Sequence, residues 1–523
     1  MNDHPQDAGG GPGSDRPPVD APGALRIARN VVAGLARGAI TLPLALITTA
    51  LILYWHGPAV LGVWAMLSVF TNPLLFCDFG ISWALTLLVA RHRADQDRFR
   101  GLVSTSLALY LALAAVLVAG YLVVRHDGAL WLSTRSSVPV ADTVACLDLA
   151  VLTYVILLIG LVPYATLNGL EAVHSTQAAT ALNQVILTAL IVALAPWTRS
   201  PTSLFVAAAA AAAWQVVYQT RVLAATLGFW PATPGAVRVL HGRTLLGQGL
   251  ALSLLETYRL GFHFLDKWIL GAFLGTGPVG YYELGVRVGM LFRGVLNALC
   301  LPLLSASATA ATSDLAQAKL RRLSHYAMRY LTLVAVPATL LVLLEAPRIL
   351  VIWTGRADPP AIAAVTHLVP SYLCNAFAWA VLYILLGGGK TGVACACALG
   401  AASLNLAVDL AALHLWGRFE PVLAMSLGAS LLTALLLVLY QVRLRLLTVG
   451  PLVPSGARIA AAGLASTLAL LALPGCFGVP TRAQAAAELT VHVALFGLVN
   501  VLVLWKLGEV DDQDRFFLSR IGL

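Results

Sequence analysis

Residues 149–167 read LAVLTYVILLIGLVPYATL, an apolar run without a single charged side chain. A helix needs about 20 mostly apolar residues to cross the hydrocarbon core of a bilayer. Similar runs recur along the whole chain, which is 59% hydrophobic and only 11% charged, with a mean hydropathy of +0.84. Soluble domains are about 45–50% apolar and about 25% charged. We therefore predict an all-α polytopic membrane protein.

The 523-residue chain has room for about 14 transmembrane helices, at about 20 residues for each span and roughly 10–15 for each loop. The apolar runs lie near residues 31–54, 59–89, 101–124, 143–168, 179–197, 203–226, 249–274, 279–310, 323–345, 361–387, 391–415, 420–441, 455–474 and 485–507. They predict a disordered cytoplasmic tail, a six-helix lobe, a cytoplasmic linker, a second six-helix lobe, two appended helices and a cytoplasmic tail, over residues 1–28, 29–226, 227–248, 249–448, 449–507 and 508–523.

This composition excludes several classes of protein. So large an apolar excess cannot be hidden in the cores of a soluble enzyme, whose surface needs charge. The unbroken runs exclude an outer-membrane barrel, whose strands alternate apolar and polar side chains over about 10 residues. The net charge of +9 is dispersed over short loops, so no basic domain is present to bind nucleic acid. The seven cysteines predict no disulfide framework.

Lysine and arginine are unevenly distributed between the two sets of loops. The loops after even-numbered spans hold 14 of these residues, and the loops after odd-numbered spans hold seven. Cytoplasmic loops carry the excess of positive charge in membrane proteins. The bias predicts a multi-pass protein of the bacterial inner membrane with both termini in the cytoplasm. The first 28 residues have no apolar stretch, so they are not a cleavable signal peptide.

An internal repeat with an offset of 218 residues is visible at two span junctions. The first reads HGPAVLGVW over 56–64, and the second reads GTGPVGYY over 275–282. Gly62 and Gly280 are equivalent in this comparison, and each is followed two positions later by an aromatic residue. Repeats of six spans point the same way through the membrane, so an axis along the membrane normal should relate the two lobes.

Charged residues inside the spans identify candidate site residues, because such groups should face the protein interior or a wet cavity. In the span near 249–274, four of them share one helical face, at i, i+3, i+7 and i+10: Glu256, Arg259, His263 and Asp266. In the next span, Glu283 and Arg287 stand at i, i+4, and Arg293 lies on another face. The first span carries Arg37 and Thr41 on a stripe of polar and small residues.

Two interpretations of these residues remain open. In the functional one, the substrate contacts are Arg37, Thr41, Arg259, His263, Arg287 and Arg293, and the coupling-ion residues are Glu256, Asp266 and Glu283. In the structural one, the charges neutralise each other, as Glu256 with Arg259, Asp266 with Lys267 or a neighbouring helix, and Arg37 with Asp78 or with the acids of the span near 249–274. No metal-ligand spacing or catalytic set is present in the sequence, so no cofactor is predicted.

Several short motifs resemble those of the oligosaccharide flippases, the Wzx-type polysaccharide transporters of the MOP/MATE-like superfamily. The similarity covers most of 29–448. Its local points are Gly62-Val63-Trp64, Asp78-Phe79-Gly80, the segment 163–169, Asp266-Lys267-Trp268-Ile269-Leu270-Gly271 and Gly280-Tyr281-Tyr282. The 14 helices and two six-helix lobes of that family agree with the layout predicted above.

The resemblance implies translocation of an undecaprenyl-diphosphate-linked oligosaccharide to the periplasmic leaflet, for exopolysaccharide, capsule or O-antigen synthesis. It implies membrane lipid as a second partner and allows contact with the polysaccharide polymerase machinery. A sugar–diphosphate head cannot cross hydrocarbon, so it needs a wet, cation-lined cavity, while its polyprenyl tail can stay in lipid. Arginine suits the diphosphate because its planar fork can bond two oxygens at once.

Two other functions compete with this one. A MATE-like exporter of cationic compounds should carry acidic residues in the first span, which here has Arg37 and no Asp or Glu. A membrane-embedded glycan polymerase or ligase should carry a large periplasmic loop, whereas the longest outer loop, near 125–142, is short. A secondary transporter is therefore preferred to an enzyme.

Overall fold

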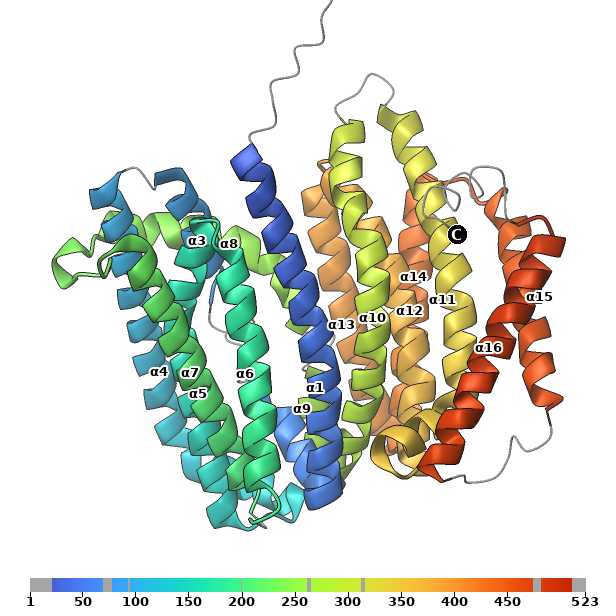
Figure 1. Ribbon diagram of the computed structural model, residues 1–523, viewed down its shortest axis with the longest axis horizontal. Helices are drawn as coiled ribbons and strands as arrows, with labels where there is room; N and C mark the ends of the chain where they lie inside the picture. Colours follow the sequence, from blue (N-terminus) through green and yellow to red (C-terminus); the bar gives the residue numbers. More distant parts are fainter. Residues whose placement is uncertain are drawn as a thin grey trace, which may run out of the picture.

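The computed structural model of the chain is a set of long helices packed side by side (Figure 1). It describes residues 21–68, 78–92, 95–198, 200–260, 265–311, 316–473 and 481–509; within these ranges the side chains of 251–260 and of a few other positions are not described. Ten helices in the described part are long and apolar enough to cross a membrane. The predicted polytopic helical fold is confirmed.

The first half of the chain forms one group of helices, with α1 at its inner edge (Figure 1). These helices are α1 (Ala21–Leu67), α3 (Ile81–His92), α4 (Gln96–Ser136), α5 (Val140–Gly169), α6 (Val173–Leu194) and α7 (Thr202–Leu227). Within α1 the chain kinks at Gly57, whose φ of 80° and ψ of 179° are accessible to glycine and costly for other residues. The kink separates the two spans predicted near 31–54 and 59–89.

The second half begins with two shorter helices, α8 (Val239–Leu260) and α9 (Asp266–Leu274). The other members are α10 (Thr276–Ala311), α11 (Ala316–Thr354), α12 (Pro359–Gly387), α13 (Thr391–Trp416) and α14 (Phe419–Arg443). The appended helices α15 (Leu452–Leu471) and α16 (Arg482–Lys506) lie at the far edge, against α11 (Figure 1).

Helices α8 and α9 both lie within the span predicted near 249–274, and residues 261–264 between them lie outside the described residues. The predicted helical face from Glu256 to Asp266 therefore stays a prediction. The buried carboxylate of Asp266 accepts hydrogen bonds from α10 and α13. Helix α8 packs against α3, α4 and α13.

The two halves meet where α1 crosses α10. A Cβ atom on Gly62 would lie 1.8 Å from the carbonyl oxygen of Thr276, and a Cβ on Gly280 would lie 2.1 Å from that of Pro58. Adding 218 to positions 58 and 62 gives 276 and 280, so each contact is the repeat copy of the other. A pseudo-two-fold axis therefore relates the two contacts, which agrees with the predicted parallel repeat.

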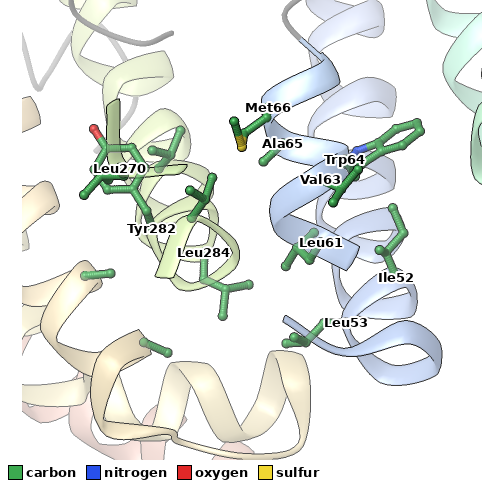
Figure 2. Close-up of a cluster of buried hydrophobic side chains, with 14 of the residues drawn as sticks. Ile52, Leu53, Leu61, Val63, Trp64, Ala65, Met66, Leu270, Tyr282 and Leu284 are labelled. Carbon is green, nitrogen blue, oxygen red and sulfur yellow. The ribbon is translucent and has the colours of Figure 1, made fainter. Parts of the chain in front are cut away.

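Apolar side chains close the space around this crossing. Leu61, Val63 and Trp64 of α1 are buried beside Tyr282 and Leu284 of α10 in one continuous core (Figure 2). The ring of Trp64 also packs on Phe205 of α7, with the ring centroids 5.3 Å apart. The junction motif thus ties α1 to both halves of the molecule.

We expect Gly62→Ala and Gly280→Ala to lower the thermal stability of the protein by about 1–3 kcal/mol, because each new methyl group meets a backbone carbonyl. The measurement is the melting midpoint of the purified protein in detergent. Gly120→Ala on α4 is the matched control, since a Cβ there meets nothing within 4 Å. An equal loss of stability in the control and in the two junction variants would contradict the close helix crossing.

Candidate functional site

A buried polar cluster joins four helices of the second half, α9, α10, α13 and α14. Asp266, the first residue of α9, accepts hydrogen bonds from the Tyr282 hydroxyl at 2.8 Å and from the Asn405 amide at 3.2 Å. The same amide donates to Asp409 at 3.3 Å, and the Ser426 hydroxyl donates to Asp409 at 2.5 Å. We call these five residues the carboxylate cluster.

The carboxylate cluster is buried and rich in oxygen. Asp266 is 4% exposed, and Asn405 and Asp409 are each 1% exposed. Two ionised carboxylates in such a site need compensation by positive charge, because an unpaired buried charge is very costly. Oxygen donors of this kind hold a proton or a hard cation, whereas softer metals prefer nitrogen or sulfur. Among the described residues, no group of three or more His, Cys, Asp and Glu could hold a metal ion.

An ion-pair triad lies next to this cluster along the chain. Glu283 of α10 is buried, with its carboxylate oxygens 2.6 Å from Lys267 Nζ and 2.7 Å from Arg287 Nε. The side chain of Lys267 is 4% exposed and that of Arg287 is 24% exposed. Two cations share one carboxylate, so the triad carries one surplus positive charge, and Arg287 is its most accessible member.

The carboxylate cluster and the triad contain neighbouring residues of the same two helices, α9 and α10. Asp266 and Lys267 are consecutive on α9, and Tyr282 and Glu283 are consecutive on α10. In each pair the first residue joins the carboxylate cluster and the second joins the triad. A displacement of α9 would therefore act on both groups together.

The structure describes three of the other predicted site residues. Arg37 and Thr41 lie on α1, the first exposed and the second half-buried, and Arg293 is half-buried on α10. The side chains of Glu256 and Arg259, and the whole of His263, lie outside the described residues. Their predicted roles stay predictions.

The pairing considered for Arg37 with Asp78 has no support, since Asp78 already has other partners. Its carboxylate accepts bonds from the Ser82 amide at 3.0 Å, the Ser82 hydroxyl at 2.7 Å and the Tyr110 hydroxyl at 2.5 Å. Within the described part of the chain, Arg37 has no recorded ion-pair partner. Lys267 forms an ion pair with Glu283 at 2.6 Å.

Sequence reasoning missed Asn405, Asp409 and Ser426 as members of the carboxylate cluster. The internal repeat holds a signal that could have found them. In the first half, Thr48 of α1 and Thr188 of α6 are hydrogen-bonded at 2.9 Å. These positions precede Asp266 and Asn405 by 218 and 217 residues, so the second half carries an acid and an amide where the first half carries two hydroxyl groups.

Buried ion pairs fasten the appended helices to α11. On α16, Glu488 bonds Arg348 at 2.7 Å, and His492 lies 2.9 Å from Glu345. Further along, Glu509 bonds Arg329 of α11 at 3.1 Å and Arg458 of α15 at 3.3 Å. These contacts give α15 and α16 a structural role beside α11.

Solved structures with the same arrangement of helices are membrane transporters. An inward-facing MATE multidrug-resistance transporter matches with a TM-score of 0.65 at 16% identity, covering 79% of this chain and 98% of its own. The lipid II flippase MurJ in an inward closed conformation matches with a TM-score of 0.67 at 10% identity, covering 91% and 99%. The chain has the fold of the MOP-superfamily transporters.

An outward-facing MATE transporter of the same superfamily matches less well, with a TM-score of 0.54 at 16% identity over 80% of this chain and 95% of its own. The sequence matches no protein-family model and no curated protein. At these identities the likeness to the MOP-superfamily transporters concerns the fold.

We expect Glu283→Gln to destabilise the protein by about 3–5 kcal/mol, because it removes the carboxylate that two cations face in a buried site. Adding Lys267→Met should recover most of that loss, since the charge balance is restored. The melting midpoints of the two single variants and the double variant form the test. Strictly additive losses would contradict direct coupling of Lys267 with Glu283.

Proposed function

We propose that this chain is a flippase that carries a polyprenyl-diphosphate-linked oligosaccharide across the bacterial inner membrane, for the synthesis of a surface polysaccharide. The observation that carries the proposal is the charge of the two helices that meet between the lobes. Helix α1 bears Arg37 and no acidic residue, and α10 bears Arg287 and Arg293 beside one acid, Glu283, which is already paired with Lys267 and Arg287. A path bordered by these helices suits an anion.

The positions of these arginines fit one path. A Cβ on Gly294 of α10 would lie 4.0 Å from Leu42 of α1, so the two helices are close where Thr41 and Arg293 stand. Arg37 lies about one turn from Thr41 on α1. A guanidinium can hold two phosphate oxygens at once, which suits a diphosphate better than a point charge does.

The contacts between the lobes support a state that is closed at one end. Arg135 at the end of α4 donates to the carbonyl oxygen of Ala272 on α9 at 2.9 Å, and Trp131 stacks on Trp268 with centroids 6.2 Å apart. Trp353 near the end of α11 donates to the carbonyl oxygen of Leu46 on α1 at 2.9 Å. In the topology predicted from the excess of lysine and arginine in the opposite loops, this is the periplasmic end.

In this proposal the substrate is taken up from the cytoplasmic leaflet. The two lobes then close at the cytoplasmic end and open at the periplasmic end. The higher TM-score for the inward-facing MATE transporter, 0.65 against 0.54 for the outward-facing one, supports this state. The carboxylate cluster supplies the coupling, by holding a proton or a cation in one state and releasing it in the other.

A MATE-like exporter is the second candidate, because MATE transporters share the fold. Two observations favour the flippase. The MurJ match covers 91% of this chain, whereas the inward-facing MATE match covers 79%. The difference is about the size of the appended helices, residues 449–507, which make up about 11% of the chain. The described residues of α1, which should be acidic for a cationic drug, are basic or neutral.

We expect Arg37→Ala to reduce glycan export per protein molecule about ten- to hundredfold, because a charge-assisted contact in a low-dielectric site is worth about 1.5–3 kcal/mol. Arg37→Lys keeps the charge and loses the fork, so partial export should remain. Arg91→Ala, an exposed arginine at the end of α3, is the matched control. Normal export per molecule in Arg37→Ala would remove Arg37 from the substrate path.

Asp266→Asn and Asp409→Asn should each abolish the dependence of transport on a proton or sodium gradient, because either change removes a charge that the bound cation compensates. Thr48→Ala at the repeat-equivalent position should leave that dependence intact. The assay is translocation of a fluorescent lipid-linked oligosaccharide in vesicles, with each gradient imposed separately. An unchanged response of both Asn variants would exclude the carboxylate cluster as the coupling site.

A further inference from the structure

A separate pocket lies between α4 and α8, away from both groups of buried charges. Its volume is about 340 Å³, within the range of about 300–1,000 Å³ of small-molecule sites. The wall on α4 is formed by Thr105, Ala108 and Leu109. The opposite wall is formed by Val237, Arg238, Val239, Gly242, Arg243 and Leu246. We call it the α4–α8 pocket.

The pocket combines an apolar floor with two arginines at its edge. On α8, Val239, Arg243, Leu246 and Leu250 follow the spacing i, i+4, i+7 and i+11, which places them on one face of the helix. Three of them are apolar and open to the surroundings, with 77%, 42% and 57% of Val239, Leu246 and Leu250 exposed. Such a face is stable against hydrocarbon and unfavourable against water.

The arginines stand where lipid headgroups would lie. Arg238 and Arg243 flank the start of α8, at the same end of the molecule as the end of α3, the start of α4 and the end of α7. Both are exposed, and neither has a recorded ion-pair partner within the described residues. Basic residues beside an apolar surface at a membrane boundary attract anionic lipid.

Contacts between α4 and the start of α8 fix the shape of the pocket. The Arg238 amide donates to the Thr105 hydroxyl at 3.1 Å, which anchors the start of α8 to α4. A Cβ on Gly101 would lie 2.4 Å from the His241 ring, so the two helices touch just beside the pocket. The floor is therefore fixed by contacts that do not involve either arginine side chain.

We propose that the α4–α8 pocket binds one anionic phospholipid of the bilayer, with an acyl chain along Ala108, Leu109 and Leu246 and the phosphate between Arg238 and Arg243. Helix α8 belongs to the second repeat by sequence but packs on α3 and α4 of the first half. A lipid in this position bridges the two halves and stabilises the arrangement in which α8 leans on α4. The proposal does not depend on the substrate that is transported.

The test is competition binding to the full-length, delipidated protein in detergent, with phosphatidylglycerol and phosphatidylcholine of equal chain length, read by native mass spectrometry. Wild type should prefer phosphatidylglycerol about 25-fold, at about fivefold for each arginine. The double variant Arg238→Gln, Arg243→Gln should bind both lipids equally. The control Arg91→Gln, Arg221→Gln removes two exposed arginines from the same end and should keep the preference.

Two further measurements distinguish a whole lipid from a free phosphate and locate the acyl chain of the lipid. Glycerol phosphate should not displace the lipid, because it lacks the acyl chains. Ala108→Trp, which fills the floor, should weaken binding of both lipids to a similar extent. The proposal is overturned if the double arginine variant keeps its preference for phosphatidylglycerol or if the control variant loses it equally. It is also overturned if farnesyl diphosphate competes for the pocket more strongly than unlabelled phosphatidylglycerol at the same concentration.

Discussion

The structure depends on a pair of contacts in which α1 and α10 touch through their backbones. At Gly62 and Gly280 a carbonyl oxygen of the other helix occupies the place of a side chain. Helices in a membrane gain no hydrophobic energy from leaving lipid, so close packing at small residues is a main source of their association. The kink at Gly57 and the break at Gly275 precede these contacts and direct the chain into them.

The repeat gives the two halves one scaffold, but their interiors differ in charge. Thr48 and Thr188 form a neutral pair in the first half, whereas Asp266 and Asn405 take the equivalent places in the second. Buried acids are costly unless something compensates them, so the second half requires a proton, a cation or a set of donors that the first half does not. Symmetry in the backbone thus coexists with a difference in chemistry.

The sequence predicted the membrane fold and the repeat, because apolar length and glycine spacing are local signals. It did not predict the carboxylate cluster, since Asp266 and Asn405 are 139 residues apart and meet only through packing. The predicted helical face that joins Asp266 to Glu256 stays a prediction, because the side chain of Glu256 lies outside the described residues. The partners of Lys267 and Arg287 were likewise undecidable from spacing alone, which offered several pairings.

Helix α9 connects these features, although it is only nine residues long. Asp266 and Lys267 at its start belong to the carboxylate cluster and the ion-pair triad, while Trp268 and Ala272 touch α4 of the other half. In the proposed cycle, a change of cation at Asp266 alters the forces on a short, rigid element that also holds one end of the molecule closed.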